Sequence, residues 1–194
     1  MKGRIVNCTL KQLGTVGLRK LTMDSIAGEL HISKRTIYQH FSSKDQLLEA
    51  CLMEWIRRNR LLVATGDNLI DEFCTLYLGF RRINLLPVVR CCRELRQHFA
   101  PVYRFFLERL NDYADACGAW AERDAEAGYL CRAFSPQTVR SVVSDFLIRI
   151  FGSAEEEMQY RSYLLSPEIL LVYIRGLCTI KGRALLDQRL KTLS

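Results

Sequence analysis

Residues 22–44 read TMDSIAGELHISKRTIYQHFSSK, and this stretch decides the fold of the first part of the chain. Its pattern predicts a short helix from about Met23 to Leu30, with Thr22 as the N-cap. After a tight turn, Ser33 is placed to cap a second helix that runs from Lys34 to about Phe41. Two short helices joined by such a turn form a helix-turn-helix, a unit that presents its second helix outward.

Apolar residues mark the sides on which the two helices would meet. They are Ile26, Ala27 and Leu30 in the first helix, Ile37 and Phe41 in the second, and Ile32 in the turn. A spacing of three or four residues places such side chains on one face of a helix. The small side chain of Ala27 would let two steeply crossing helices approach closely. We therefore expect a packed helix pair.

The opposite face of the second helix is polar. It carries Lys34, Arg35, Thr36, Tyr38, Gln39 and His40. Cations, hydroxyls, amides and imidazoles are the groups that hydrogen-bond to DNA phosphates and base edges. A helical hairpin with a solvated basic face is the alternative, but the agreement of caps, turn and apolar pattern favours a helix that reads the major groove.

The distribution of charge supports this interpretation. Residues 1–60 hold 11 Lys plus Arg against 5 Asp plus Glu, a net charge of +6, whereas residues 61–194 hold 17 against 16, a net charge of +1. Positive charge concentrated beside a helix-turn-helix is typical of a DNA-binding protein. A membrane-surface protein would combine it with an exposed apolar stripe.

A third helix is predicted to begin at Ser43 and to run to about Val63, joining the two parts of the chain. Ser43 and Gln46 form the Ser-x-x-Gln pattern of a capping box. Lys44 lies in the first turn, where a cation opposes the helix dipole. We therefore expect a phosphate of the partner beside Lys44.

The run SKRTIYQHFSSKDQLLEA, residues 33–50, resembles the DNA-binding domain of TetR-type transcriptional repressors. The positions in register are Thr22, Ile26, Ala27, Ser33, Tyr38, His40, Phe41, Ser43, Lys44 and Leu47. The resemblance implies that the residues facing DNA are Lys34, Arg35, Thr36, Tyr38, Gln39 and His40, and that Thr22 and Lys44 touch phosphates. His31 departs from the family pattern, which has Gly or Ala there. We expect His31 to adopt the positive φ of this turn at a modest cost.

The remainder of the chain reads as helical throughout, so the predicted fold class is all-α. We expect a three-helix helix-turn-helix domain over residues 1–60 and a helical effector-binding and dimerisation domain over residues 61–194. The predicted helices of the second domain are 67–85, 88–97, 101–127, 136–152 and 167–180. Ser135-Pro136 and Ser166-Pro167 each predict an N-cap followed by Pro at the first helical position.

The last two predicted helices carry more apolar surface than one small core can cover. A helix that is apolar all round must be covered on two sides, so we expect a second subunit and hence a homodimer. The resemblance implies the same, because the last two long helices of that family pair as a four-helix interface. The expected interface residues are Val143, Phe146, Leu147, Ile150, Leu170, Leu171 and Ile174. The alternative, an intramolecular core only, stays open.

The middle helices are expected to hold a pocket for an unknown small-molecule effector. The candidate lining residues are Phe73, Tyr77, Phe80, Phe99, Tyr103, Phe106, Tyr113 and Trp120. Aromatic residues at helical spacing are more often core packing than ligand contacts. We expect a repressor whose affinity for double-stranded operator DNA falls when the effector binds.

Other classes of function find little support in the sequence. No phosphate-binding loop, His-Glu-x-x-His or Cys-x-x-Cys motif occurs, so we expect no enzyme, no cofactor and no metal. We find no signal peptide and no apolar run long enough for a membrane span, which predicts a cytoplasmic protein with reduced, mostly buried thiols. The alternative function is a thiol- or metal-responsive regulator using Cys91, Cys92 and His98.

Overall fold

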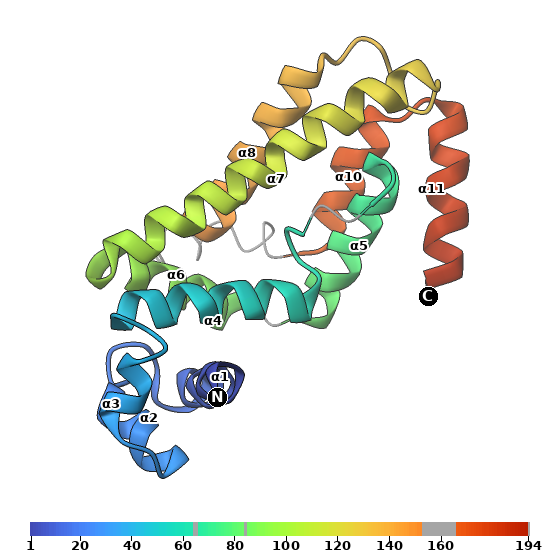
Figure 1. Cartoon of the computed structure of the whole chain (residues 1–194). Helices are drawn as coiled ribbons and strands as arrows, with labels where there is room; N and C mark the ends of the chain where they lie inside the picture. The colour runs from blue at the N-terminus through green and yellow to red at the C-terminus, as the bar shows by residue number, and fades with distance from the viewer. Residues whose placement is uncertain (64–65, 84, 153–165, 194) are drawn as a thin grey trace.

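The computed structural model describes residues 1–63, 66–83, 85–152 and 166–193, and these residues form ten helices and no β-strand (Figure 1). The helices are α1 (Lys2–Val16), α2 (Met23–Leu30), α3 (Lys34–Tyr38), α4 (Lys44–Asn59), α5 (Leu69–Arg82), α6 (Leu85–His98), α7 (Ala100–Glu126), α8 (Pro136–Gly152), α10 (Glu168–Leu177) and α11 (Ile180–Leu193). A single isolated bridge joins Leu130 and Cys178 within this part of the chain. The predicted all-α fold class is confirmed.

The helices form a small unit at one end and a larger body beyond it (Figure 1). Helices α1, α2 and α3 make the small unit, and α4 leads from it along the edge of the body toward α5. The long helices α7 and α8 lie side by side, and α5, α10 and α11 gather at the far end. The helix-turn-helix is therefore held away from most of the second domain, with α4 as the connection.

Hydrogen bonds and backbone angles at the helix ends explain where α2 begins and ends and where α3 begins. The Thr22 hydroxyl accepts from the Ser25 N–H at 3.0 Å, and the Ser25 hydroxyl accepts from the Thr22 N–H at 3.2 Å. The Ser33 hydroxyl accepts from the Thr36 N–H at 3.0 Å and so caps α3. His31 closes α2 with φ 53° and ψ 44°. The predicted caps and the positive φ of His31 are confirmed.

Helices α3 and α4 are shorter than predicted. Helix α3 ends at Tyr38 rather than near Phe41. Helix α4 ends at Asn59 rather than near Val63, because the chain turns inward to bury Leu61. A Cβ atom on Gly79 of α5 would lie 2.6 Å from Leu61 Cδ2, so the glycine makes room for that leucine.

Part of the predicted capping box is also wrong. The Ser43 hydroxyl accepts from the Gln46 N–H at 3.1 Å, as expected. The Gln46 side chain, however, accepts from the backbone N–H of Ser42 at 2.6 Å rather than from that of Ser43. The cap therefore reaches one residue further back and fixes the entry of the chain into α4.

Two helices were not predicted from the sequence. Helix α1 escaped notice because Thr9 and Gln12 interrupt its apolar face, although both side chains are buried. The Thr9 hydroxyl donates to the Ile5 carbonyl at 2.8 Å, and the Gln12 amide donates to Glu29 at 2.6 Å. Helix α11 covers Ile180–Leu193, beyond the end of the helix that the sequence predicts over 167–180.

The remaining helix boundaries show smaller differences. Ser135 caps α8 as predicted, because its hydroxyl accepts from the Thr138 N–H at 3.1 Å. Helix α10 begins at Glu168, one residue later than expected, with Pro167 as its N-cap. Helix α6 begins at residue 85, three residues before the predicted start.

The apolar core has two parts that meet at the domain junction. One cluster is built mainly from α1 to α4, but it also includes Leu95 of α6 and Val102 of α7. The other fills the second domain and begins with Ile56 of α4. Because Leu95 and Val102 are 4% and 0% exposed, the corner between α6 and α7 is packed into the first domain.

The residues expected at a dimer interface lie mostly inside a single chain. Leu171 alone is half-buried, and the others are buried, namely Val143, Phe146, Leu147, Ile150, Leu170 and Ile174. These six side chains pack α8 and α10 against the protomer's own core, which agrees with the alternative of an intramolecular core. The apolar side chains that remain exposed on α8 and α10 are Val142, Ile148, Val172 and Tyr173.

Candidate DNA interface and domain junction

Helix α3 is anchored by buried apolar side chains, and its polar residues face away from the core. Ile37 of α3 and Phe41, just after it, are 0% and 1% exposed, and they anchor the helix on the first domain. The side chain of Thr36 is half-buried, and the other predicted DNA-facing residues of the motif are exposed, namely Lys34, Arg35, Tyr38, Gln39 and His40. The structure therefore leaves these side chains accessible on α3 and in the residues directly after it.

Two of these side chains have partners within the protein. Lys34 Nζ lies 2.9 Å from an oxygen of Asp24, a residue in the first turn of α2. The hydroxyls of Thr36 and Ser33 lie 2.8 Å apart. The side chains of Arg35 and Gln39 make no hydrogen bond or ion pair with the described residues. Arg35 and Gln39 thus keep their donors and acceptors available on the outer face.

Lys44 lies differently from the prediction that a phosphate would be its partner. Its ammonium donates to the backbone carbonyls of Leu18 and Leu21 at 3.3 and 2.6 Å, and lies 4.7 Å from the centre of the Phe99 ring. Burial lowers the pKa of Lys44, although the neighbouring Asp45 opposes this shift. In this conformation the side chain ties segments of the protein together, and its contact with a phosphate stays a prediction.

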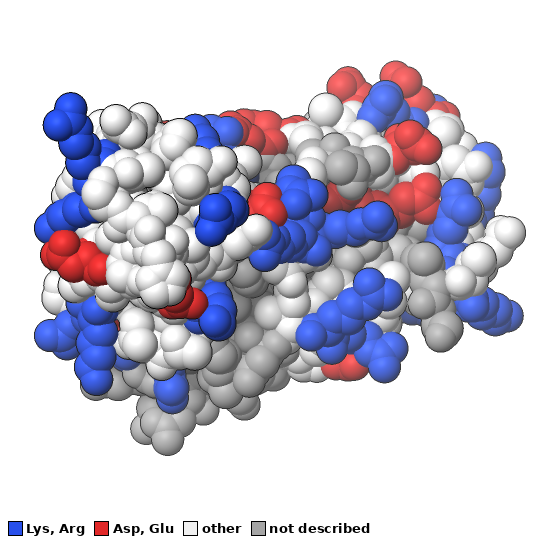
Figure 2. Space-filling view, turned by 60° about the horizontal axis from the view of Figure 1, so that its bottom comes forward, with Lys and Arg blue, Asp and Glu red and all other residues white. Residues whose placement is uncertain are grey.

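The surface around the helix-turn-helix is basic. Figure 2 brings the lower end of Figure 1 forward, and blue Lys and Arg side chains clearly outnumber red Asp and Glu side chains on that face. The exposed cations of the first domain include Lys2, Arg4, Lys11, Arg19, Lys20, Lys34, Arg35, Arg57, Arg58 and Arg60. Such a surface attracts a polyanion and makes its binding sensitive to salt.

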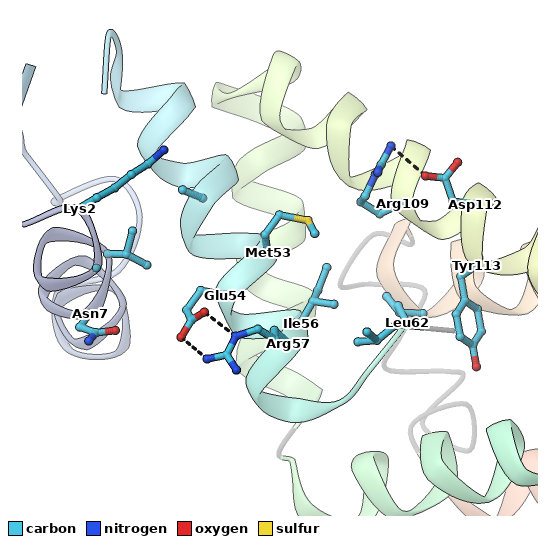
Figure 3. A pocket seen from close by; sticks show the side chains of 14 residues that line it. Lys2, Asn7, Met53, Glu54, Ile56, Arg57, Leu62, Arg109, Asp112 and Tyr113 are labelled. Atoms are coloured by element: carbon cyan, nitrogen blue, oxygen red, sulfur yellow. Dashed lines mark hydrogen bonds and ion pairs between the residues drawn. The ribbon is translucent and has the colours of Figure 1, made fainter. Parts of the chain in front are cut away.

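A cleft of about 770 Å³ lies between α1, α4 and α7, where the two domains meet (Figure 3). Met53 and Ile56 of α4 line it, and Lys2 of α1 reaches toward it from the first domain. Its charged side chains are largely paired, because Arg57 bonds to Glu54 and Arg109 lies 2.9 Å from Asp112. The cleft thus separates α1 from α7.

The aromatic residues expected to line an effector pocket are mostly core. Phe73, Phe80, Phe106, Tyr113 and Trp120 are buried, whereas Tyr77, Phe99 and Tyr103 are half-buried. Phe151 packs edge-on against Phe80 and Phe106, with ring centres 6.4 and 5.5 Å away. Phe73 and Tyr113 border a hollow of only about 20 Å³ between α5, α7, α8 and α10. Tyr113 also borders the cleft of about 770 Å³, and Phe106 borders a second apolar space of about 230 Å³. The effector pocket stays a prediction.

The thiol chemistry does not favour the alternative of a thiol or metal sensor. All eight cysteines are free, and Cys91 is half-buried while Cys92 is buried. Burial raises the pKa of Cys91 to about 11 and that of Cys92 further, so both thiols are protonated at neutral pH. The described residues contain no group of three or more side chains suited to a metal ion. Within the same residues, no helix is long and apolar enough to span a membrane.

The geometry defines a class of protein, a basic helix-turn-helix domain joined through one helix to a larger helical domain. Residues 5–51 match the family described as "Bacterial regulatory proteins, tetR family". Over 100 residues the chain is 34% identical to uncharacterized HTH-type transcriptional regulators of Mycobacterium tuberculosis and Mycobacterium bovis. That match covers 52% of this chain and 44% of those relatives, so it spans less than half of their length.

Solved structures share the fold over nearly the whole chain. GusR of Salmonella enterica superposes with a TM-score of 0.66 at 17% identity, covering 91% of this chain and 94% of GusR. CprB of Streptomyces coelicolor, a TetR family protein, superposes with a TM-score of 0.59 at 19% identity, covering 100% of this chain and 97% of CprB. The match over residues 5–51 confirms the resemblance of the helix-turn-helix part of the chain to TetR-type regulators.

Sequence reasoning missed the residues that join the two domains. Leu95, Phe99 and Val102 surround the corner between α6 and α7 and contact the first domain. The only signal in the sequence was the apolar character of these residues, which is equally typical of a core. The ion pair between Lys34 and Asp24 was also missed, because the sequence does not show which way Asp24 faces on α2.

Proposed function

We propose that this protein binds double-stranded operator DNA and regulates transcription by inserting α3 into the major groove. The observation that carries the proposal is the outward face of α3, where Arg35 and Gln39 lack partners among the described residues. Arg pairs with guanine and Gln with adenine in the major groove, so these two side chains are assigned to base readout. Tyr38, His40 and Thr22 are assigned to phosphate contacts. CprB has been solved in complex with its biological operator sequence.

The protein acts as a homodimer in this proposal. The exposed faces of α8 and α10 carry Val142, Ile148, Val172 and Tyr173, which a second copy would cover. Val172 is 67% exposed. This is an unusual environment for an apolar residue on a helix that is apolar over most of its length. Two copies would present two recognition helices about 34 Å apart, as successive major grooves require.

Repression and its release by a small-molecule effector complete the proposal. The corner between α6 and α7 is packed into the first domain, so a ligand that shifts α6 or α7 also shifts the helix-turn-helix. Operator affinity would fall by the ratio of the ligand's affinities for the two arrangements of the domains. We place this activity in the cytoplasm, where bacterial operators lie.

Selection of duplexes from a random pool, followed by binding measurements across salt concentrations, tests the proposal. We expect one enriched sequence with two half-sites related by two-fold symmetry. We also expect affinity to fall steeply with salt, because Lys and Arg displace counterions from phosphates. Equal recovery of all sequences would contradict the assignment of base readout to α3.

A further inference from the structure

An apolar cavity of about 230 Å³ lies at the domain junction, between α1, α4 and α6. Its walls include Leu13 and Gly14 of α1, Leu52 and Trp55 of α4, and Cys91 and Leu95 of α6. All of the residues that line it are Leu, Val, Phe, Trp, Cys or Gly. The cavity is distinct from the cleft of Figure 3, whose lining includes Lys2, Arg57 and Arg109.

The chemistry of the cavity suits a neutral apolar molecule. A bound water needs two to four polar partners, and the side chains of these walls offer only weakly polar thiols and the single indole N–H of Trp55. Burial raises the pKa of Cys51 to about 12 and that of Cys91 to about 11, so no lining side chain is charged at neutral pH. An apolar cavity of about 150 Å³ is already large enough to bind benzene.

The position of the cavity connects it to both domains. Leu13 and Gly14 belong to the first domain, whereas Cys91 and Leu95 lie on α6, which leads into the corner packed against that domain. Leu95 lines the cavity and is also part of the first domain's core cluster. A molecule in the cavity would therefore touch α1 and α6 at once and fix their separation.

We propose that this cavity is a binding site for a neutral apolar molecule of one or two rings, and that its occupation changes the affinity of the protein for operator DNA. The second half of this proposal rests on the proposed function, but the first half does not. The ligand class follows from the size of the cavity and from the absence of charge among its lining residues.

The test uses p-xylene as the probe and Trp55 as the reporter. The chain has two tryptophans, so Trp120→Phe leaves Trp55 as the only one. Excitation at the red edge of tryptophan absorption avoids absorption of the light by p-xylene. We expect a saturable change in Trp55 emission on addition of p-xylene to the full chain, whose fold is checked by circular dichroism. No saturable change would overturn the proposal.

Two glycines of the same helix provide the matched variants. A Cβ atom at Gly14 or at Gly3 would meet nothing within 4 Å, but only Gly14 lines the cavity. Gly14→Leu should fill the space and abolish p-xylene binding, whereas Gly3→Leu should leave it unchanged. Cys91→Phe fills the cavity from the opposite wall and should have the same effect if Gly14→Leu does not fold. Retention of binding by a folded filling variant would place the ligand elsewhere.

Thiol labelling gives a second readout at the site. At a p-xylene concentration about ten times its Kd, the free fraction is about one tenth, so labelling of Cys91 should slow about tenfold. Cys131, which is half-buried and does not line the cavity, should react at an unchanged rate. Equal slowing of both thiols would indicate a general change in the fold and would overturn the assignment.

A final arm separates this proposal from the proposed function. The Kd for p-xylene is measured with and without selected operator DNA, and the Kd for the operator is measured with and without p-xylene. The ratio of the two Kd values must be the same in both experiments by linkage. Binding of p-xylene with equal affinity in both conditions would overturn the regulatory half alone. Failure of the protein to bind any operator would contradict the proposed function and leave the cavity site standing.

Discussion

The ammonium of Lys44 lies 4.7 Å from the centre of the Phe99 ring, and this contact joins the start of α4 to the corner between α6 and α7. The same ammonium donates to the carbonyls of Leu18 and Leu21, just before the helix-turn-helix. One side chain thus links three segments that are distant in sequence. It provides a direct physical connection between the second domain and the DNA-facing unit.

Replacing Lys44 by Met should lower the free energy of unfolding by about 1–2 kcal/mol, because two hydrogen bonds from a charged donor are lost. Urea denaturation measures the change. Lys20→Met is the control, since Lys20 is exposed and makes no side-chain hydrogen bond with the described residues. If Lys44→Met instead leaves stability unchanged and reduces the salt slope of DNA binding by about one, Lys44 contacts a phosphate in the complex.

Replacing Arg35 by Ala should reduce the preference for one base pair of the operator by about 1–3 kcal/mol, because a bidentate contact with a base is lost. Competition between single-base variants of the operator measures this preference. Lys11→Ala removes the same charge from α1, where Lys11 pairs with Glu29 at 3.0 Å, and should leave the preference intact. A uniform loss of affinity for all sequences in the Arg35 variant would assign Arg35 to a phosphate.

Replacing Val172 by Asp should give a folded monomer with weak operator binding, because a charge would be buried without a partner in the dimer. Sedimentation velocity measures the assembly. Ile180→Asp is the control, since Ile180 is 89% exposed at the start of α11 and lies outside the proposed interface. Ile174→Asp should unfold the protein instead, because Ile174 is 0% exposed within the single chain. A persistent Val172→Asp dimer would contradict the proposed interface.

Replacing Gly182 by Ala should destabilise the protein by about 2–4 kcal/mol, because a methyl group would overlap a backbone atom that cannot move aside. A Cβ atom there would overlap the Tyr129 carbonyl oxygen. Gly176→Ala is the matched control, because a Cβ atom at Gly176 would meet nothing within 4 Å. Thermal unfolding compares the two variants, and equal stability would show that α11 can shift without cost.

The buried thiols predict that stability falls at alkaline pH. Burial raises the pKa values of Cys51, Cys74 and Cys117 from 9.0 to about 12. Between pH 9 and about pH 12 these thiols lose their protons in the unfolded chain but keep them in the folded chain. The free energy of unfolding therefore decreases as pH rises. Urea denaturation from neutral pH to about pH 10 measures the slope, and Cys51→Val should make it shallower. A slope unchanged by that substitution would assign the loss to other groups.

The sequence by itself determined the helix-turn-helix and its polar face. Thr22 and Ser33 cap their helices and His31 takes a positive φ as expected, because caps and turns depend on contacts within a few residues. The sum of charges over residues 1–60 likewise needs no coordinates. Local chemistry was sufficient for these features.

Only the tertiary structure decided where side chains with two possible environments lie. Lys44 could face a phosphate or the protein, and its position depends on Leu18, Leu21 and Phe99, which come from other segments. An apolar residue such as Ile174 or Val172 can pack into its own core or cover a partner, and helical period alone does not distinguish these two faces of α10. Such choices are made by long-range packing, because burial depends on which elements meet in space.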